Sequence, residues 1–147
     1  MAFDVETQRK LLTTFFGQGI PFNKILGLEI VELSDGYAKT RIPYRAELIG
    51  DPTRPALHGG VLSATIDATA GAAAFTMVTM PHDRISTIDL RIDYLRPGEL
   101  KDVLCEARVR RMGNRVASVD AFAFHPDERD TPVATGKAVY NVKRKGD

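Results

Sequence analysis

Apolar and polar side chains alternate along most of the second half of the chain, which is the pattern typical of half-buried β-strands. The alternation occupies four stretches, 88–93, 103–110, 115–124 and 133–142. A similar alternation on both sides of Ser34-Asp35-Gly36 predicts a hairpin over 28–42. Because short turns make neighbouring strands antiparallel, the pattern predicts an antiparallel sheet.

The first of the four stretches places its side chains on two distinct faces. One face carries the apolar side chains Ile88, Leu90, Ile92 and Tyr94. Thr87 opens the strand on the other face, together with Asp89. Alternating charges on a strand usually form cross-strand pairs, so we interpret those of this second face as structural.

Two segments predict helices. Residues 4–18 are amphipathic, and Gly17, Gly19 and Pro21 are expected to end that helix. Residues 59–80 are almost wholly apolar or small, which favours a helix buried in the core. The segments 50–55 and 125–132 are expected to be loops, the latter polar, with His82 and His125 exposed.

These elements combine into one α+β domain spanning residues 1–147, with an N-terminal helix over 4–18 and a core over 21–143. An antiparallel sheet with a single apolar helix buries that helix against one face. The edge strand and the other face then remain available for association, which favours a symmetric dimer or a larger assembly.

Composition and charge exclude several classes of protein. A net charge of +1 over 147 residues gives no electrostatic footprint for nucleic acid. Residues 61–80 are long enough to span a membrane, but they are rich in Ala, Thr and Gly and contain Asp67, so membrane insertion is not expected. The single Cys105 excludes an internal disulfide and suits a reducing cytoplasm. The first residues lack the apolar core of a signal peptide.

Asp67 is the one charged residue of the apolar helix. A buried ionised acid is costly unless it is paired or hydrogen-bonded. Asp67 therefore either performs chemistry, or it is held by the hydroxyl of Ser63 or Thr69, or it lies at a hydrated dimer interface.

The start of the same helix is a second candidate for chemistry. His58-Gly59-Gly60 stands where the preceding loop becomes the helix, and glycines allow a ligand to approach the backbone closely. The first amides of a helix have no intrahelical partner and can stabilise an oxyanion. The Thr87 hydroxyl is placed to orient a water molecule or the acid. No His or carboxylate set has metal-ligand spacing, and no Gly-rich loop is typical of a phosphate cradle.

Three segments carry a family resemblance: IPFNKILGLEIVELSDGYAKTRIPYR, then ALHGGVLSATIDATAGAAAF, then STIDLRIDYLRPG. Together they resemble the hotdog-fold acyl-CoA thioesterases, and more narrowly the phenylacetyl-CoA thioesterase type, in which an Asp follows His-Gly-Gly after nine residues. The resemblance covers residues 21–142. It implies a hotdog fold, in which an antiparallel sheet wraps around a long central helix.

The resemblance also implies roles for individual residues. Asp67 would be the catalytic carboxylate, as nucleophile or as general base for water. The Gly59 amide, helped by Gly60, would polarise the thioester carbonyl, His58 would shape the loop, and Thr87 would assist the water. The acid and the glycines of one site would come from different subunits of a homodimer or homotetramer. An acyl-CoA or aryl-CoA is the implied substrate, so coenzyme A is part of the substrate and no separate cofactor is expected.

The sequence departs from the family at one position and leaves several alternatives open. Many relatives carry an Asn six residues before the His, where this chain has Pro52, so Arg54 or another group replaces that Asn or its role is dispensable. The cations that flank one turn, Arg108, Arg110, Arg111 and Arg115, either bind the phosphates of coenzyme A or form a solvated hairpin end.

Two other functions compete with thioester hydrolysis. A non-catalytic acyl-CoA-binding or sensing protein on the same fold is the alternative. A hotdog hydratase ranks last because it requires an Asp-His pair on the central helix, and no His lies within 59–80.

Overall fold

The alternating stretches pair into one six-stranded antiparallel sheet in the computed structural model, which describes residue 2 and residues 4–146. In spatial order its strands are β1 (Glu29–Ser34), β2 (Tyr37–Ile42), β6 (Val103–Met112), β7 (Val116–Phe124), β8 (Ala134–Lys143) and β5 (Arg84–Tyr94). Each neighbouring pair is antiparallel, so the predicted antiparallel sheet is confirmed. The edges are β1 and β5.

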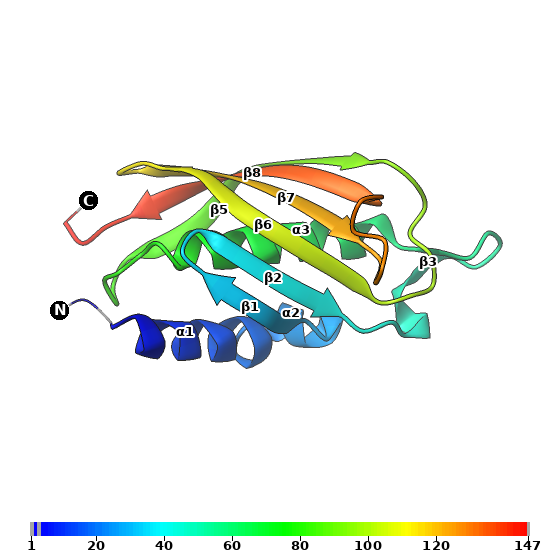
Figure 1. The fold of residues 1–147 in the computed structure, drawn as a ribbon, viewed down its shortest axis with the longest axis horizontal. Coiled ribbons are helices and arrows are strands. Elements are labelled where there is room, and N and C mark those ends of the chain that lie inside the picture. Colours follow the sequence, from blue (N-terminus) through cyan, green and yellow to red (C-terminus); the bar gives the residue numbers. More distant parts are fainter. Residues whose placement is uncertain (1, 3, 147) are drawn as a thin grey trace.

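The apolar segment forms the central helix α3 (Gly59–Phe75), and the sheet curves around it (Figure 1). Alternate residues of the strands are buried on the face toward α3, which confirms the hotdog architecture expected from the sequence. The buried polar side chains of this core are hydrogen-bonded, as buried polar groups must be. Thr65 Oγ1 donates to Val61 O at 2.6 Å, and Thr69 Oγ1 lies 2.6 Å from Thr40 Oγ1.

The central helix is shorter than predicted, because it ends at Phe75 and not at Met80. Thr76 is the C-cap residue and ties the helix end to the β1–β2 hairpin. Its hydroxyl donates to Ala73 O at 2.6 Å and accepts from Gly36 N–H at 2.8 Å. The following residues then lead the chain back to the start of β5 at Arg84.

The helix predicted over 4–18 is confirmed, and a second short helix follows it. Helix α1 (Val5–Thr14) is capped by Asp4, whose Oδ1 accepts from Thr7 N–H at 3.0 Å, and it continues into a π-helical turn, η1, which ends at Gly19 (Phe15–Gly19). Pro21 then begins α2 (Pro21–Leu26), because proline at the first helical position loses no hydrogen bond. Both helices lie beside β1 in Figure 1.

The loop predicted over 125–132 is confirmed, and the one predicted over 50–55 contains the turn of a small hairpin. That hairpin is formed by β3 (Ile49–Asp51) and β4 (Ala56–Leu57), and the short helix η2 (Ala46–Leu48) precedes it. His125 is buried, with 1% of its surface exposed, so its predicted exposure is wrong. Its ring joins two loops, since Nε2 accepts from Glu99 N–H at 2.9 Å and Nδ1 lies 2.9 Å from Asp102 O. No helix within the described residues is long and apolar enough to cross a membrane.

Candidate active site

The central helix begins at a histidine that caps it with its own side chain. His58 Nδ1 accepts a hydrogen bond from Gly60 N–H at 2.8 Å, which satisfies one of the unpaired amides of the first turn. The Gly60 amide is therefore occupied in this conformation. Within the described part of the chain, the Gly59 N–H has no acceptor. This arrangement leaves one amide, that of Gly59, available to polarise a carbonyl.

Tyr94 of β5 covers the same helix start. Its hydroxyl donates to Gly59 O at 3.3 Å. A Cβ atom at position 59 would lie 3.3 Å from Cε1 of the Tyr94 ring, closer than ordinary side-chain packing allows. Glycine at this position thus permits the close approach of the ring to the backbone.

Asp67 lies eight residues further along α3 and is half-buried, not enclosed in the core. Its Oδ1 accepts two hydrogen bonds, from Thr87 Oγ1 at 2.9 Å and from Tyr140 Oη at 3.1 Å. Tyr140 Oη also lies 2.7 Å from the main-chain oxygen of Asp67. Ser63 and Thr69, the other partners considered, bond to main-chain oxygens of α3. Both donors hold Oδ1, which leaves Oδ2 as the oxygen available to a reactant.

Tyr140 is the residue of this site that sequence reasoning missed. It lies in the last strand, 73 residues from Asp67, and only 2% of its surface is exposed. Burial first, and then the charge and hydrogen bond of Asp67, raise the pKa of Tyr140 well above its usual range. The phenol therefore keeps its proton and remains a donor at all working pH values. Its sequence context, alternating apolar residues of a strand, gives no signal of this contact.

Thr87 reaches Asp67 because of an irregularity in β5. The register between β5 and β8 shifts between Thr87 and Asp89, so that Ile88 is bulged out and 59% exposed. A bulge adds one residue and reverses which face the following side chains occupy. The predictions that Thr87 shares a face with Asp89, and that Ile88 shares one with Leu90, are therefore wrong. Thr87 faces α3 and Ile88 faces outward.

The side of α3 that carries Asp67 is not covered by the sheet. Ser63, Ala64, Asp67 and Ala68 are partly exposed, whereas their neighbours on the sheet side are buried. Residues at spacings of three and four lie on one side of a helix, so these form one stripe.

A cavity of about 410 Å³ opens along this stripe, a size typical of small-molecule sites. Apart from Asp67 and Arg84, its lining is uncharged and mostly apolar. The N-terminal segment and α3 supply the apolar walls, Phe15, Phe16, Ile20, Phe22, Ala68 and Phe75.

The loop that carries Pro52 has its own hydrogen bonds. Asp51 Oδ1 accepts from Thr53 N–H at 2.9 Å and from Arg54 N–H at 3.1 Å. The Thr53 hydroxyl, followed by these amides, holds the pKa of the Asp51 carboxyl below its usual range. Arg54 Nε reaches the other oxygen of Asp51 at 3.3 Å, and the side chain of Arg54 is 90% exposed. Arg54 thus faces solvent and Asp51, so the geometry gives no support for its replacing the family's Asn.

The predicted phosphate-binding arginines separate into two groups. Arg111 and Arg115 line a hollow of about 460 Å³ at the β6–β7 turn, together with Ser118. Arg110 instead lies on the outer face of the sheet, where its Nε pairs with Asp120 at 3.2 Å.

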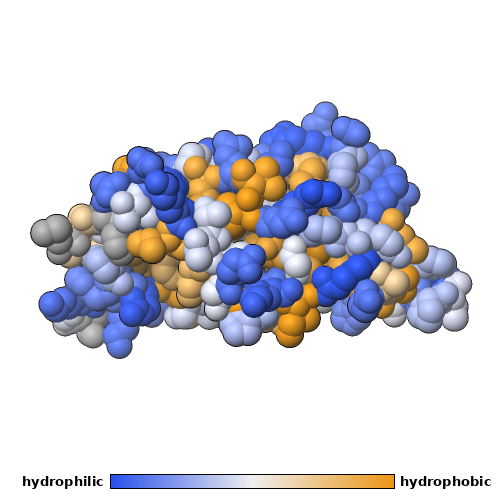
Figure 2. Space-filling model, turned by 90° about the horizontal axis from the view of Figure 1, so that it is seen from below, coloured by the Kyte–Doolittle hydropathy of each residue, from blue (hydrophilic) through white to orange (hydrophobic). Residues whose placement is uncertain are grey.

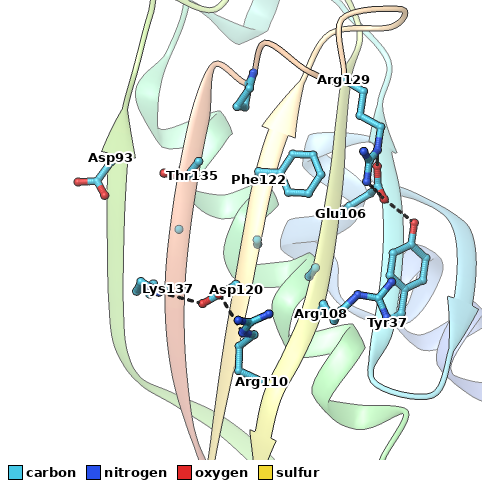
Figure 3. Close-up of a pocket in the computed structure, with 14 residues that line it drawn as sticks. Tyr37, Asp93, Glu106, Arg108, Arg110, Asp120, Phe122, Arg129, Thr135 and Lys137 are labelled. Atoms are coloured by element: carbon cyan, nitrogen blue, oxygen red, sulfur yellow. Dashed lines mark hydrogen bonds and ion pairs between the residues drawn. The ribbon is translucent and has the colours of Figure 1, made fainter.

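A second large cavity, about 440 Å³, lies on the outer face of the sheet, away from α3 (Figure 3). Its charged side chains satisfy one another. Glu106 Oε2 accepts from Arg129 Nε at 2.6 Å and its Oε1 accepts from Tyr37 Oη at 2.9 Å, while Lys137 Nζ lies 3.2 Å from Asp120 (Figure 3). Among the described residues, no three His, Cys, Asp or Glu side chains are placed to hold a metal ion. The cavity beside Asp67 is therefore the better candidate for chemistry.

Comparison with known proteins is consistent with this site. Residues 55–131, which contain Gly59, Asp67 and Thr87, match the model of the thioesterase superfamily. The chain is 32% identical to the medium/long-chain acyl-CoA thioesterase YigI of Salmonella typhimurium over 93% of this chain and 95% of that protein. It is 31% identical to the protein of the same name from Escherichia coli K12, with the same coverage.

Solved structures agree with the sequence comparison. A Shewanella oneidensis protein related to the thioesterase superfamily superposes with a TM-score of 0.76 at 29% identity, over 93% of this chain and 98% of that one. Fold, family model and full-length relatives all agree, and the chain belongs to the thioesterase superfamily.

Proposed function

We propose that this protein hydrolyses medium- and long-chain acyl-CoA thioesters to a free acid and coenzyme A. The observation that carries the proposal is the position of Asp67 on the wall of an apolar cavity, with Oδ1 held by two donors and Oδ2 without a protein partner among the described residues. The names of the full-length relatives support the acyl-CoA substrate class.

The chemistry follows from these groups. The Gly59 amide would donate to the thioester oxygen and stabilise the negative charge that develops there. Oδ2 of Asp67 would either attack the carbonyl carbon or take the proton of an attacking water. In the first case a mixed anhydride with Asp67 forms as the C–S bond breaks, and water then hydrolyses it to the free acid and the carboxylate. In the second case the water oxygen forms the new C–O bond directly as the C–S bond breaks. In both cases the departing thiolate of coenzyme A takes up a proton. Thr87 would orient the carboxylate.

One chain is not sufficient for this reaction. With a rise of about 1.5 Å per residue, Gly59 and Asp67 are separated by about 12 Å along α3, so one thioester carbonyl cannot contact both in the same subunit. We therefore propose a homodimer, alone or within a homotetramer, in which the Gly59 amide of one subunit faces Asp67 of the other. The unpaired edge of β5 is the surface that supports such pairing.

Two further proposals concern the coenzyme A part of the substrate and the location of the protein in the cell. The hollow formed by Arg111 and Arg115 has the cations that suit the phosphates of coenzyme A. Arg110 is paired with Asp120 on the other face, and we leave it out of this site. The free, buried Cys105 suits a cytoplasmic location.

Free-thiol release from a panel of acyl- and aryl-CoA esters tests the activity. We expect turnover by the wild type, no turnover by Asp67→Asn, and full turnover by the control Asp120→Asn, which changes the same group on the outer face. Activity retained in Asp67→Asn would refute the role of Asp67. Saturable binding of acyl-CoA without thiol release would favour the non-catalytic binding protein.

Subunit complementation tests the shared site. Gly59→Pro removes the amide proton at a position where helices tolerate proline. Gly59→Ala keeps the amide and is the control for the added Cβ, which would lie 3.3 Å from the Tyr94 ring. A mixed dimer of Asp67→Asn and Gly59→Pro chains would contain one intact site, so random mixing should restore roughly a quarter of the wild-type activity. If both groups acted within one chain, mixing would restore none.

A further inference from the structure

Two apolar cavities meet at the N-terminal segment. The site cavity beside Asp67 measures about 410 Å³. The second, which we name the distal cavity, measures about 420 Å³ and lies further from Asp67, toward the end of α3. Its apolar lining includes Leu11, Leu12 and Val78. Phe15, Phe75 and Arg84 line both cavities, so these side chains form a wall that the two cavities share.

Phe15 stands at the junction of the two cavities. Its ring makes edge contacts with Phe16 and Phe75, at centroid distances of 5.5 and 6.4 Å. The ring is carried by the π-helical turn η1, in which Ile20 N–H donates to Phe15 O at 3.0 Å. Such turns occur frequently at functional sites. Phe15 is 47% exposed, so its ring has room to change position or to be shortened without disturbing the core.

The distal cavity also has polar groups in its lining. Asp83, whose side chain is 2% exposed, lines it and pairs with Arg144 at 3.4 Å. The Gln8 side-chain amide also lines it and donates to Phe75 O at 3.2 Å. These polar groups bond to other protein groups, so the apolar side chains of the lining remain the surface available to an acyl chain.

We propose that the distal cavity receives the terminal methylenes of a long acyl chain, and that Phe15 determines the chain length which the site prefers. This inference rests on the proposed function, and it assigns the tail of the same substrate. The cavities share a wall and one of them contains Asp67, so the occupant we assign is the tail of an acyl chain whose carbonyl lies at Asp67. On the face that carries α1 and α2, apolar side chains reach the surface between polar ones (Figure 2), as an apolar groove open to solvent requires.

Binding of non-hydrolysable S-alkyl-CoA thioethers with 8 to 16 carbons, measured by calorimetry, tests the inference separately from turnover. Each additional buried methylene should tighten binding about fourfold. In Phe15→Ala the junction is wider, and the preference for 16 over 8 carbons should rise about tenfold or more, because two or more further methylenes are buried. In Leu11→Trp, which fills the distal cavity, that preference should fall while 8-carbon binding is unchanged.

Phe22→Ala is the matched control, since Phe22 lines the site cavity only and is 55% exposed. It should weaken all chain lengths by the same factor. If Phe15→Ala behaved like this control, or if affinity were independent of length beyond 8 carbons, the inference would be overturned. A change of oligomeric state in Leu11→Trp, seen by light scattering, would instead show that a second copy of the chain covers the distal cavity and would equally overturn it. Absence of thiol release by the wild type would overturn the proposed function alone.

Discussion

Replacing Tyr140 by Phe removes one hydroxyl from the site and leaves the ring in place. In the wild type this hydroxyl lies 3.1 Å from Asp67 Oδ1 and 2.7 Å from the main-chain oxygen of the same residue. The side chain is buried, so water cannot replace the lost donor. The loss of this donor leaves Asp67 Oδ1 with the Thr87 hydroxyl as its remaining donor and the carboxylate less firmly oriented.

The size of the effect follows from the geometry. A hydrogen bond to a charged group contributes about 1.5–3 kcal/mol. The single phenol proton is shared between two acceptors, so we take about 1.5 kcal/mol, which corresponds to a factor of about ten in rate. If the hydroxyl positions the carboxylate for the reaction, kcat/KM should therefore fall about tenfold in Tyr140→Phe.

The assay is free-thiol release from the preferred acyl-CoA at one fixed pH. Thr87→Val removes the other donor to Oδ1, 2.9 Å away, and should also lower kcat/KM. Thr87→Ser keeps the hydroxyl and should retain the wild-type value. Wild-type kcat/KM in both Tyr140→Phe and Thr87→Val would refute the reasoning that these hydroxyls position the acid.

Three further predictions concern the fold. Gly136→Ala places a Cβ 2.6 Å from a side-chain atom of α3 and should lower the free energy of unfolding, measured in urea, by about 1–3 kcal/mol. In the control Gly71→Ala the nearest contact of the added Cβ is 3.7 Å, and the loss should be less than about 1 kcal/mol. Burial is the largest single influence on the pKa of Glu106 and acts to raise it, but the hydrogen bonds from Arg129 and Tyr37 and the nearby cations together keep that pKa below its usual range. The ionised Glu106 side chain therefore stabilises the fold at pH values above its unfolded-state pKa, and this contribution is lost as the pH falls. Glu106→Gln should flatten the decline in unfolding free energy between pH 7 and pH 3. An unchanged slope would contradict this reasoning. Burial raises the pKa of the Cys105 thiol to about 12. The thiol of the folded protein should therefore not react with a disulfide reagent at pH 8 until the protein unfolds. Prompt labelling would contradict the position of Cys105 in the core.

The sequence was most informative where the signal is local. Strand alternation and short turns predicted the antiparallel sheet, because the side-chain period of two depends only on neighbouring residues. The spacing from His58 to Asp67 was readable for the same reason, since both residues lie on one continuous helix. The length of α3 was less accurate, because its end is fixed by a hydrogen bond from the Gly36 amide, 40 residues away, to Thr76.

The sequence was least informative where distant segments meet. Alternation indicates that Tyr140 faces the core, but it does not indicate that the hydroxyl will meet Asp67. The bulge at Ile88 is equally invisible to periodicity, and one extra residue was enough to move Thr87 to the face that carries the site. His125 was assigned to solvent on the polarity of its loop, whereas its two ring nitrogens serve buried main-chain groups of another loop.

The positions of Gly59 and Asp67 on α3 limit the ways in which two subunits of the proposed dimer could pair. Because Gly59 and Asp67 belong to one rigid helix, no loop movement within a subunit can bring them to the same carbonyl. Tyr94 already covers one side of Gly59 through its hydrogen bond to the main-chain oxygen. In the proposed homodimer, a carbonyl held by the partner's carboxylate would therefore approach the Gly59 amide from the side that Tyr94 leaves open. Catalysis would then depend on one particular docking of two chains, and we propose that the edge of β5, which ends at Tyr94, imposes that docking.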